Sequence, residues 1–367
     1  MSNHRVFIIC GEASGDLHAA NLVRELRTIN NDLSIEGWGG DRLIEEGVQV
    51  KKHVKELSFM GFLEVLLNLG TILKNFKTCK AQIEAFAPSV LILVDFPGFN
   101  LRMAKWAKQK GIKVVYYISP QLWAWKQGRI KKIKAYVDAM YCILPFETDF
   151  YKDFGVEVKY FGHPLLDEIK RFNEQDEAIL PFSKPVLAVL PGSRMQEVRR
   201  KLPIMLAAAK SFTDYHIVVA CSTQIDASFF KEYEGDGVSF LFGKTYPILK
   251  IASLAFVTSG TATLETALFN VPQVVCYKGN GLSIWIAKRI VKIKYISLVN
   301  LILNQALVVE LIQENCNVPQ LVASMQALSQ REQKTKVLAG YKSLSAMLGG
   351  EGASRRIAAS MHETFLS

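Results

Sequence analysis

The sequence lacks any uncharged apolar run of about 18 residues, the length that a helix needs to span a bilayer. This absence is informative because half of the 367 residues are hydrophobic. The first apolar run, residues 6–10, is only five residues long, which is too short for the core of a secretory signal peptide. We therefore expect a protein that stays in the cytoplasm and does not cross the membrane.

Motifs for metals, dinucleotides and nucleic acids are also missing. The six cysteines are scattered without CxxC spacing, so we interpret them as buried thiols. The sequence contains no DxD motif and no cluster of His and Cys, no GxGxxG follows a strand, and no zinc-finger, RNP or basic-zipper pattern is present. We expect no metal, no cofactor and no nucleic-acid partner.

Positive charge is in excess. Lysine and arginine number 44 against 34 aspartates and glutamates, which gives a net charge of +10. Such an excess favours anionic partners. With nucleic acid disfavoured, phospholipid surfaces and phosphorylated substrates remain.

Short β-branched runs alternate with amphipathic stretches, a pattern typical of βαβ units and parallel sheets. Four predicted strands precede residue 150 and five follow residue 184, separated by a charged, strandless segment at 167–184. We predict an α/β protein of two doubly wound, Rossmann-like domains that face a cleft. The domains are residues 1–170, onto which a last helix at 351–367 packs back, and residues 171–350. The predicted strands are residues 5–10, 90–94, 113–118, 139–144, 185–190, 216–220, 238–242, 254–257 and 273–277.

In doubly wound sheets, ligands bind beyond the carboxyl ends of the strands. After the first strand, GEASGD runs into a helix, and its small residues let a ligand approach the backbone. We take Glu12 and Asp16 from this turn as catalytic candidates and Ser14 as an acceptor contact. Asp95 ends the next predicted strand and is the best candidate general base, with Asn100 as a further acceptor contact. The alternatives are that Asp16 and Asp95 only cap the helices that follow them.

Two turns in the second half also join strands to helices. The first brings Gly192, Ser193 and Arg194 to a helix start, where the planar guanidinium could clamp a diphosphate. The second offers glycine and hydroxyl groups for further phosphate contacts and an acid for ribose hydroxyls. Arginine and helix dipoles would then stabilise a leaving group without a metal. A surface-loop arginine and a capping box are the alternatives. The candidates in the second turn are Ser259, Gly260, Thr261, Ala262, Thr263 and Glu265.

Three stretches favour contact with a lipid surface. Residues 61–69 are rich in large apolar side chains but too short to span a bilayer, so they either dip into the lipid interface or form a core helix. Residues 123–134 and 285–294 both pair tryptophan with lysine and arginine, as interfacial surfaces do, although a solvated helix face is the alternative for each. Together they predict a peripheral protein on the anionic inner face of the inner membrane. The acceptor and lipid candidates are Phe62, Leu66, Leu67, Trp123 and Trp125.

These residues resemble the lipid-A-disaccharide synthase family, whose motifs occur here in the family's order over most of the chain. The pair of GEASGD and SGTATLE is specific. The sequence departs from the family at Val299, where the family usually has proline, and at Gln305 and Ala306, where it has an Arg-Glu pair. The matching stretches are GEASGD at 11–16, DFPGFN at 95–100, SPQLWAW at 119–125, LPFE at 144–147, GHP at 162–164, LPGSR at 190–194, SGTATLE at 259–265 and SLVNL at 297–301.

The resemblance implies a GT-B fold and a metal-free, inverting glycosyl transfer. The donor would be UDP-2,3-diacylglucosamine, the acceptor 2,3-diacylglucosamine 1-phosphate, and the products the β-1,6-linked lipid A disaccharide and UDP. Asp95 would be the base on the acceptor 6-hydroxyl. Arg194 and the turn at 259–265 would face UDP, and Asn300 would lie near the donor.

Two other functions stay open at this point. One is another UDP-sugar enzyme, such as a UDP-GlcNAc 2-epimerase, although that enzyme acts on a soluble substrate and has little use for the apolar residues 61–69. The other is a non-catalytic lipid- or phosphate-binding protein, which the intact Asp95 and Arg194 disfavour. A homodimer is also left open.

Overall fold

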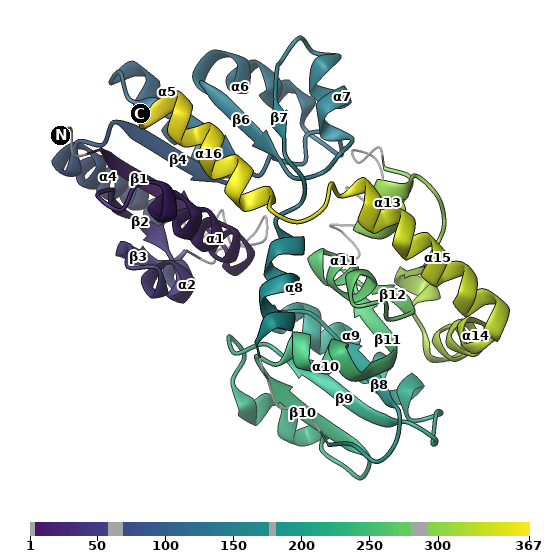
Figure 1. Ribbon diagram of the computed structural model, residues 1–367. Coiled ribbons are helices and arrows are strands. Elements are labelled where there is room, and N and C mark those ends of the chain that lie inside the picture. Colours follow the sequence, from purple (N-terminus) through teal and green to yellow (C-terminus); the bar gives the residue numbers. More distant parts are fainter. Residues whose placement is uncertain (1–3, 58–68, 176–180, 280–292) are drawn as a thin grey trace. The chain divides into compact units, whose positions relative to one another are not determined.

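The computed structural model of the chain describes residues 4–57, 69–175, 181–279 and 293–367. The chain forms two compact units, Met1–Glu168 with Gly349–Ser367, and Ile169–Leu348 (Figure 1). Each unit is built on its own parallel sheet with helices between the strands. The predicted α/β class with two doubly wound sheets is therefore confirmed.

The first unit contains a seven-stranded sheet. Its strands are β1 (Arg5–Cys10), β2 (Ser34–Gly39), β3 (Gln49–His53), β4 (Val90–Val94), β5 (Lys113–Tyr117), β6 (Ala139–Cys142) and β7 (Lys159–Tyr160). They lie parallel in the order β3-β2-β1-β4-β5-β6-β7. The helices are α1 (Ala13–Ile29), α2 (Asp41–Glu45), η1 (Val54–Glu56), α4 (Leu69–Phe86), α5 (Pro97–Gln109), η2 (Gln127–Arg129), α6 (Ile130–Tyr136), α7 (Glu147–Lys152) and α16 (Ala353–Phe365).

Hydrophobic layers cover both faces of this sheet. Along β1, Val6 and Ile8 belong to one buried cluster and Phe7 and Ile9 to another. The first cluster includes residues of α1 and α16, and the second includes residues of α4 and α5. Strands buried on both faces need apolar residues at every position, which explains why β4 is an unbroken VLILV.

The last helix, α16, packs against α1, at the other end of the sequence (Figure 1). Its Ile357 and Met361 are buried in the same cluster as α1. The Asp167 carboxylate accepts hydrogen bonds from the backbone N–H groups of Gly352 and Ser354, the latter at 2.8 Å, and so caps the start of α16.

The second unit contains a six-stranded parallel sheet. Its strands are β8 (Val186–Leu190), β9 (His216–Cys221), β10 (Val238–Phe242), β11 (Ala252–Thr258), β12 (Gln273–Tyr277) and β13 (Val309–Ile312). They follow the order β10-β9-β8-β11-β12-β13. The helices are α9 (Met195–Ala209), η3 (Ala227–Tyr233), α10 (Thr245–Ile251), α11 (Thr261–Leu268), α13 (Leu298–Leu303), η4 (Gln313–Asn315), α14 (Val318–Ser329) and α15 (Arg331–Met347), and α8 (Leu165–Glu174) carries the chain from the first unit into the second.

All nine predicted strands are present, with ends that differ from the prediction by two residues at most. Four further strands, β2, β3, β7 and β13, were not predicted. Gly37 and Gly39 interrupt the apolar pattern of β2, and β3 is a polar strand at the sheet edge. Gly37 is required because a Cβ there would lie 2.2 Å from the carbonyl oxygen of Ile8.

Candidate active site

The turns after β1 and β4 lie side by side, because these strands pair in parallel with Cys10 opposite Val94. This brings Glu12 and Asp95 to the same edge of the first sheet. The turns approach so closely that a Cβ on Gly11 would lie 2.4 Å from the Phe96 ring. Glycine at position 11 is therefore a requirement of this edge, where α/β sheets bind ligands.

The backbone of Asp95 has a left-handed conformation that hydrogen bonds from two other residues hold in place. Asp95 and Phe96 have positive φ angles of 45° and 49°, a conformation that costs a non-glycine residue about 1–2 kcal/mol. The Asp95 carbonyl accepts hydrogen bonds from the Tyr116 hydroxyl at 2.6 Å and the Asn100 amide at 2.8 Å. The N-cap of α5 is Phe96 and no side chain caps that helix. The alternative in which Asp95 only caps its helix is therefore wrong.

The environment of Asp95 suits a base at neutral pH. Burial, and after it the negative charge of Glu12, raise the pKa of Asp95 to about 7. A general base works best when its pKa lies near the operating pH. The Asp95 carboxylate can therefore take a proton from a hydroxyl group that reaches this edge of the sheet.

Asp16 does not cap its own helix, so that alternative is wrong. It lies inside α1 and is buried, and its carboxylate accepts from the backbone N–H groups of Gly40 at 2.6 Å and Arg42 at 3.0 Å. It therefore caps α2. These bonds give Asp16 a structural role, and its predicted catalytic role stays a prediction.

Asn100 helps to hold the Asp95 turn. It is fully buried, and its amide donates to the carbonyls of Val94 and Asp95 at 3.2 and 2.8 Å. Its side-chain oxygen has no hydrogen-bond partner among the described residues, and its predicted contact with the acceptor stays a prediction. Ser14, by contrast, is exposed in the first turn of α1, after the N-cap Glu12.

In the second unit, the two predicted turns follow the adjacent strands β8 and β11, which pair with Leu190 opposite Val257. Gly192 has a φ of +116°, and Arg194 is the N-cap of α9. Ser193 is exposed, and the half-exposed Arg194 side chain lies 3.3 Å from Glu197. Both turns thus lead into helix N-termini at one edge of the sheet, the arrangement that binds anions.

Some side chains of the turn after β11 form hydrogen bonds within the protein. Gly260, with φ +135°, is the exposed N-cap of α11 and has no side chain to cap it, so the alternative of a capping box with Ser259 or Thr261 at the N-cap is wrong. The hydroxyl of Thr263 donates to the Gly260 carbonyl at 2.8 Å, and that of Ser259 donates to Ile296 at 2.8 Å. Glu265 accepts from Tyr246 at 3.2 Å. Thr261 and Ala262 are half-buried in the first turn of α11.

Asn300 fixes the segment before β13. Its amide donates to the Val308 carbonyl at 2.8 Å and to Glu310 at 2.9 Å, and its oxygen accepts from the N–H groups of Leu307 and Val308 at 2.9 and 3.0 Å. These bonds give Asn300 a structural role, and its predicted contact with the donor stays a prediction.

The tryptophans of the SPQLWAW stretch differ from each other. Trp123 is half-buried and donates to the buried Glu147 at 3.3 Å. Trp125 is 41% exposed, with the Lys126 ammonium 4.2 Å from its ring centre. Trp125 is thus the one of the two that can reach a surface. Phe62, Leu66 and Leu67, and most of residues 285–294, lie outside the described residues.

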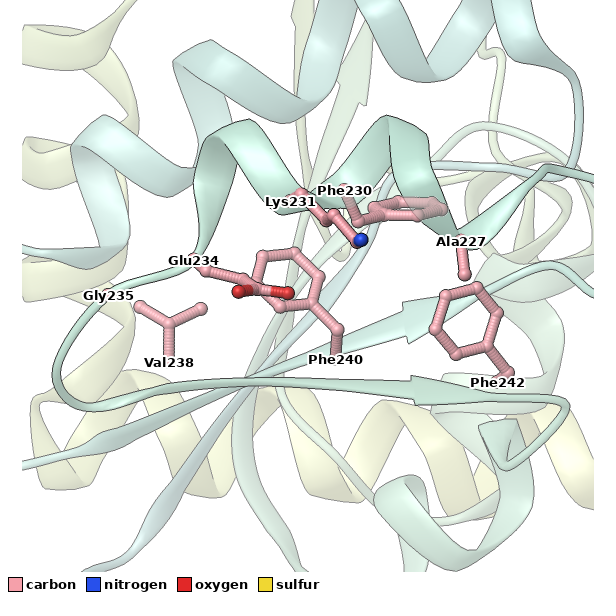
Figure 2. A pocket seen from close by; sticks show the side chains of 8 residues that line it. All are labelled: Ala227, Phe230, Lys231, Glu234, Gly235, Val238, Phe240 and Phe242. Atoms are coloured by element: carbon pink, nitrogen blue, oxygen red, sulfur yellow. The ribbon is translucent and has the colours of Figure 1, made fainter.

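A pocket of about 420 Å³ lies between η3 and the edge strand β10. Figure 2 shows its aromatic lining of Phe230, Phe240 and Phe242 together with Lys231 and Glu234. None of the predicted site residues that the structure describes lines it. This pocket is therefore separate from the strand-end turns that carry the candidate residues. No helix in the described part of the chain is long and apolar enough to cross a membrane.

Comparison with solved structures shows the fold. A UDP-GlcNAc 2-epimerase from Neisseria meningitidis, bound to UDP-GlcNAc, aligns with a TM-score of 0.67 at 11% identity over 98% of this chain and 100% of its own. The glycosyltransferase of kitacinnamycin aligns with a TM-score of 0.68 at 14% identity, covering all of both chains. The GT-B fold class is confirmed.

Comparison with known sequences shows the family. A family model described as lipid-A-disaccharide synthetase matches residues 6–362. The lipid-A-disaccharide synthase of Geobacter metallireducens is 37% identical over 97% of this chain and 96% of its own, and that of Myxococcus xanthus is 38% identical over 98% and 97%. The chain is a glycosyltransferase that belongs to the lipid-A-disaccharide synthase family.

Proposed function

We propose that this enzyme moves 2,3-diacylglucosamine from its UDP conjugate onto the 6-hydroxyl of 2,3-diacylglucosamine 1-phosphate. The acceptor oxygen bonds to the sugar C1 while the bond from C1 to the UDP oxygen breaks, and the acceptor proton passes to Asp95. A single displacement of this kind inverts C1 and yields the β-1,6-linked disaccharide and UDP. The observation that carries the proposal is the Asp95 carboxylate, at a strand end and with a pKa of about 7.

We assign the acceptor to the first unit and the donor to the second. Asp95, Glu12 and the exposed Ser14 all belong to the first unit. The helix-start turns of Gly192–Arg194 and Ser259–Glu265 belong to the second, and their N–H groups and the arginine suit a diphosphate. As UDP leaves, negative charge grows on its phosphate oxygens, so donors preorganised there stabilise the transition state more than the bound substrate.

We further propose that the enzyme works at the anionic inner face of the inner membrane. The side chains that support this proposal lie on α6 and on the turn before it. Trp125, Lys126, Lys131 and Lys132 are exposed there, while Ile133 of the same helix is buried. Tryptophan suits the headgroup region, and each basic residue near an anionic surface contributes about 1 kcal/mol.

The test is product analysis with both lipid substrates. We expect UDP and disaccharide in a 1:1 ratio, no UDP when the acceptor is omitted, and a β linkage by NMR. An enzyme that instead interconverts UDP-GlcNAc without an acceptor would be an epimerase. Binding of both lipids without turnover would indicate a non-catalytic protein. Either of these results would overturn the proposal.

A further inference from the structure

Lys201 is a buried lysine beneath the Gly192 turn. It lies on α9 and is 3% exposed. Its ammonium donates to the hydroxyl of Thr258, the last residue of β11, and lies 3.7 Å from Glu197. A Cβ added to Gly192 would come within 3.6 Å of the same ammonium. The positive charge therefore lies directly behind the backbone of this turn.

The fold alone does not explain a charge at this position. Lys201 lies on the buried face of α9, beside Val198, Leu202 and Met205, where an apolar side chain would be expected. Removing an ammonium from water is costly unless another group compensates, and buried ion pairs are often no more stable than hydrophobic replacements. Burial is the main cause that lowers the pKa of Lys201. Because packing of the core does not require a lysine here, Lys201 is a candidate for a role in the site at the Gly192 turn.

Two cations meet one carboxylate at this turn. Glu197 is shared between Arg194 at 3.3 Å and Lys201 at 3.7 Å. A hydrogen bond with Cys276, and after it the charges of Lys278 and Lys201, lower the pKa of Cys316 to about 7, so that this thiol also belongs to the charged surroundings of Lys201. The cations at this strand end favour the binding of an anion there.

We propose that Lys201 supplies, from beneath the Gly192–Arg194 turn, a fixed positive charge for the diphosphate of the nucleotide donor. This inference rests on the proposed function and deepens it by adding a residue to the donor site. Arg194 meets the diphosphate from the exposed side of the turn, and Lys201 acts through the backbone of the turn without leaving the core. Because the Lys201 side chain is already in place, it does not have to be ordered when the donor binds.

The competing explanation is that Lys201 has a structural role and connects α9 to β11 through its hydrogen bond with Thr258. The two explanations predict different effects on ligand affinity. A charge directed at phosphates changes the affinity for UDP but not for uridine, whereas a structural contact changes the shape of the site and therefore the affinity for both ligands. Thr258→Val is the matched control because it removes the hydrogen bond and keeps the ammonium.

The experiment measures UDP and uridine affinities by calorimetry for the wild type, Lys201→Met and Thr258→Val. We expect Lys201→Met to weaken UDP binding at least 10-fold with uridine unchanged, and Thr258→Val to leave the ratio of the two affinities unaltered. If Lys201→Met binds UDP normally, or loses UDP and uridine equally, the proposal is wrong. If the wild type itself does not bind UDP, both this proposal and the proposed function fail.

A second variant decides the question if Lys201→Met does not fold. Glu197→Gln changes a side chain that is 38% exposed and removes the carboxylate that neutralises both cations. The charge proposal predicts UDP binding several-fold tighter than in the wild type, with uridine unchanged. Weaker UDP binding in a folded Glu197→Gln protein would contradict it.

Discussion

Replacing Glu12 by Gln tests the electrostatic origin of the Asp95 base. Deprotonated Asp95 is the active form, so kcat/KM should fall about tenfold per pH unit below its pKa of about 7. The whole rise of this pKa runs from an ordinary 3.8 to about 7, and burial is its larger cause. The charge of Glu12 is the second cause, and a hydrogen bond from the Phe96 N–H acts in the opposite direction. We expect Glu12→Gln to move the acid limb of the profile to lower pH by about one unit, which is about 1.4 kcal/mol of interaction.

The assay is the pH dependence of kcat/KM for UDP release, measured from pH 5 to 9 with both lipid substrates. Glu12→Asp is the matched control, since it keeps the charge and should leave the acid limb close to its wild-type position. An unchanged limb in Glu12→Gln would show that Glu12 does not influence Asp95. A limb that moves to higher pH would refute the sign of the argument.

Three further predictions concern the donor, the core and the membrane. Arg194→Ala should weaken UDP binding by about 1.5–3 kcal/mol, and wild-type activity should survive EDTA; unchanged affinity would assign Arg194 to the surface. Burial lowers the pKa of His18 to about 4 and of His163 to about 3. Below pH 6.5 the two histidines bind protons in the unfolded chain but not in the folded one. The free energy of unfolding, measured by urea titration, should therefore fall by about 2 kcal/mol per histidine by pH 5; a free energy that does not change with pH would contradict this. Changing the exposed Lys131 and Lys132 to Glu should release the protein from anionic vesicles in sedimentation assays at low salt, and unaltered sedimentation would place the membrane surface elsewhere.

Local patterns predicted the central strands and the turns that follow them. Strands such as VLILV are buried on both faces and read as unbroken apolar runs, so their position and the loop after each could be inferred from the sequence. Asp95 was identified in this way. The edge strand β3 lacks this signal because its Lys51 is exposed and its His53 is only partly buried.

Long-range contacts explain the corrections. The sequence pattern places Asp16 before a helix that it could cap, yet Asp16 lies inside α1 and caps α2, which starts 25 residues later. His18 and His163 bury their rings 6.1 Å apart although they are far apart in the sequence. Lys201 reads as one basic residue in the run Arg199–Arg200–Lys201, and only the packing of α9 shows that it is the buried one. Local patterns therefore show which residue types are present, but they do not show which distant residues these side chains contact.

The most direct test of the account is the single-turnover rate of Asp95→Asn at pH 8, where the wild-type carboxylate is ionised. Asparagine keeps the size of the side chain but cannot accept the acceptor proton. We predict a folded protein that binds UDP as the wild type does and transfers the sugar about 10²–10⁴ times more slowly. A rate close to that of the wild type would remove Asp95 from the chemistry and contradict the proposed mechanism.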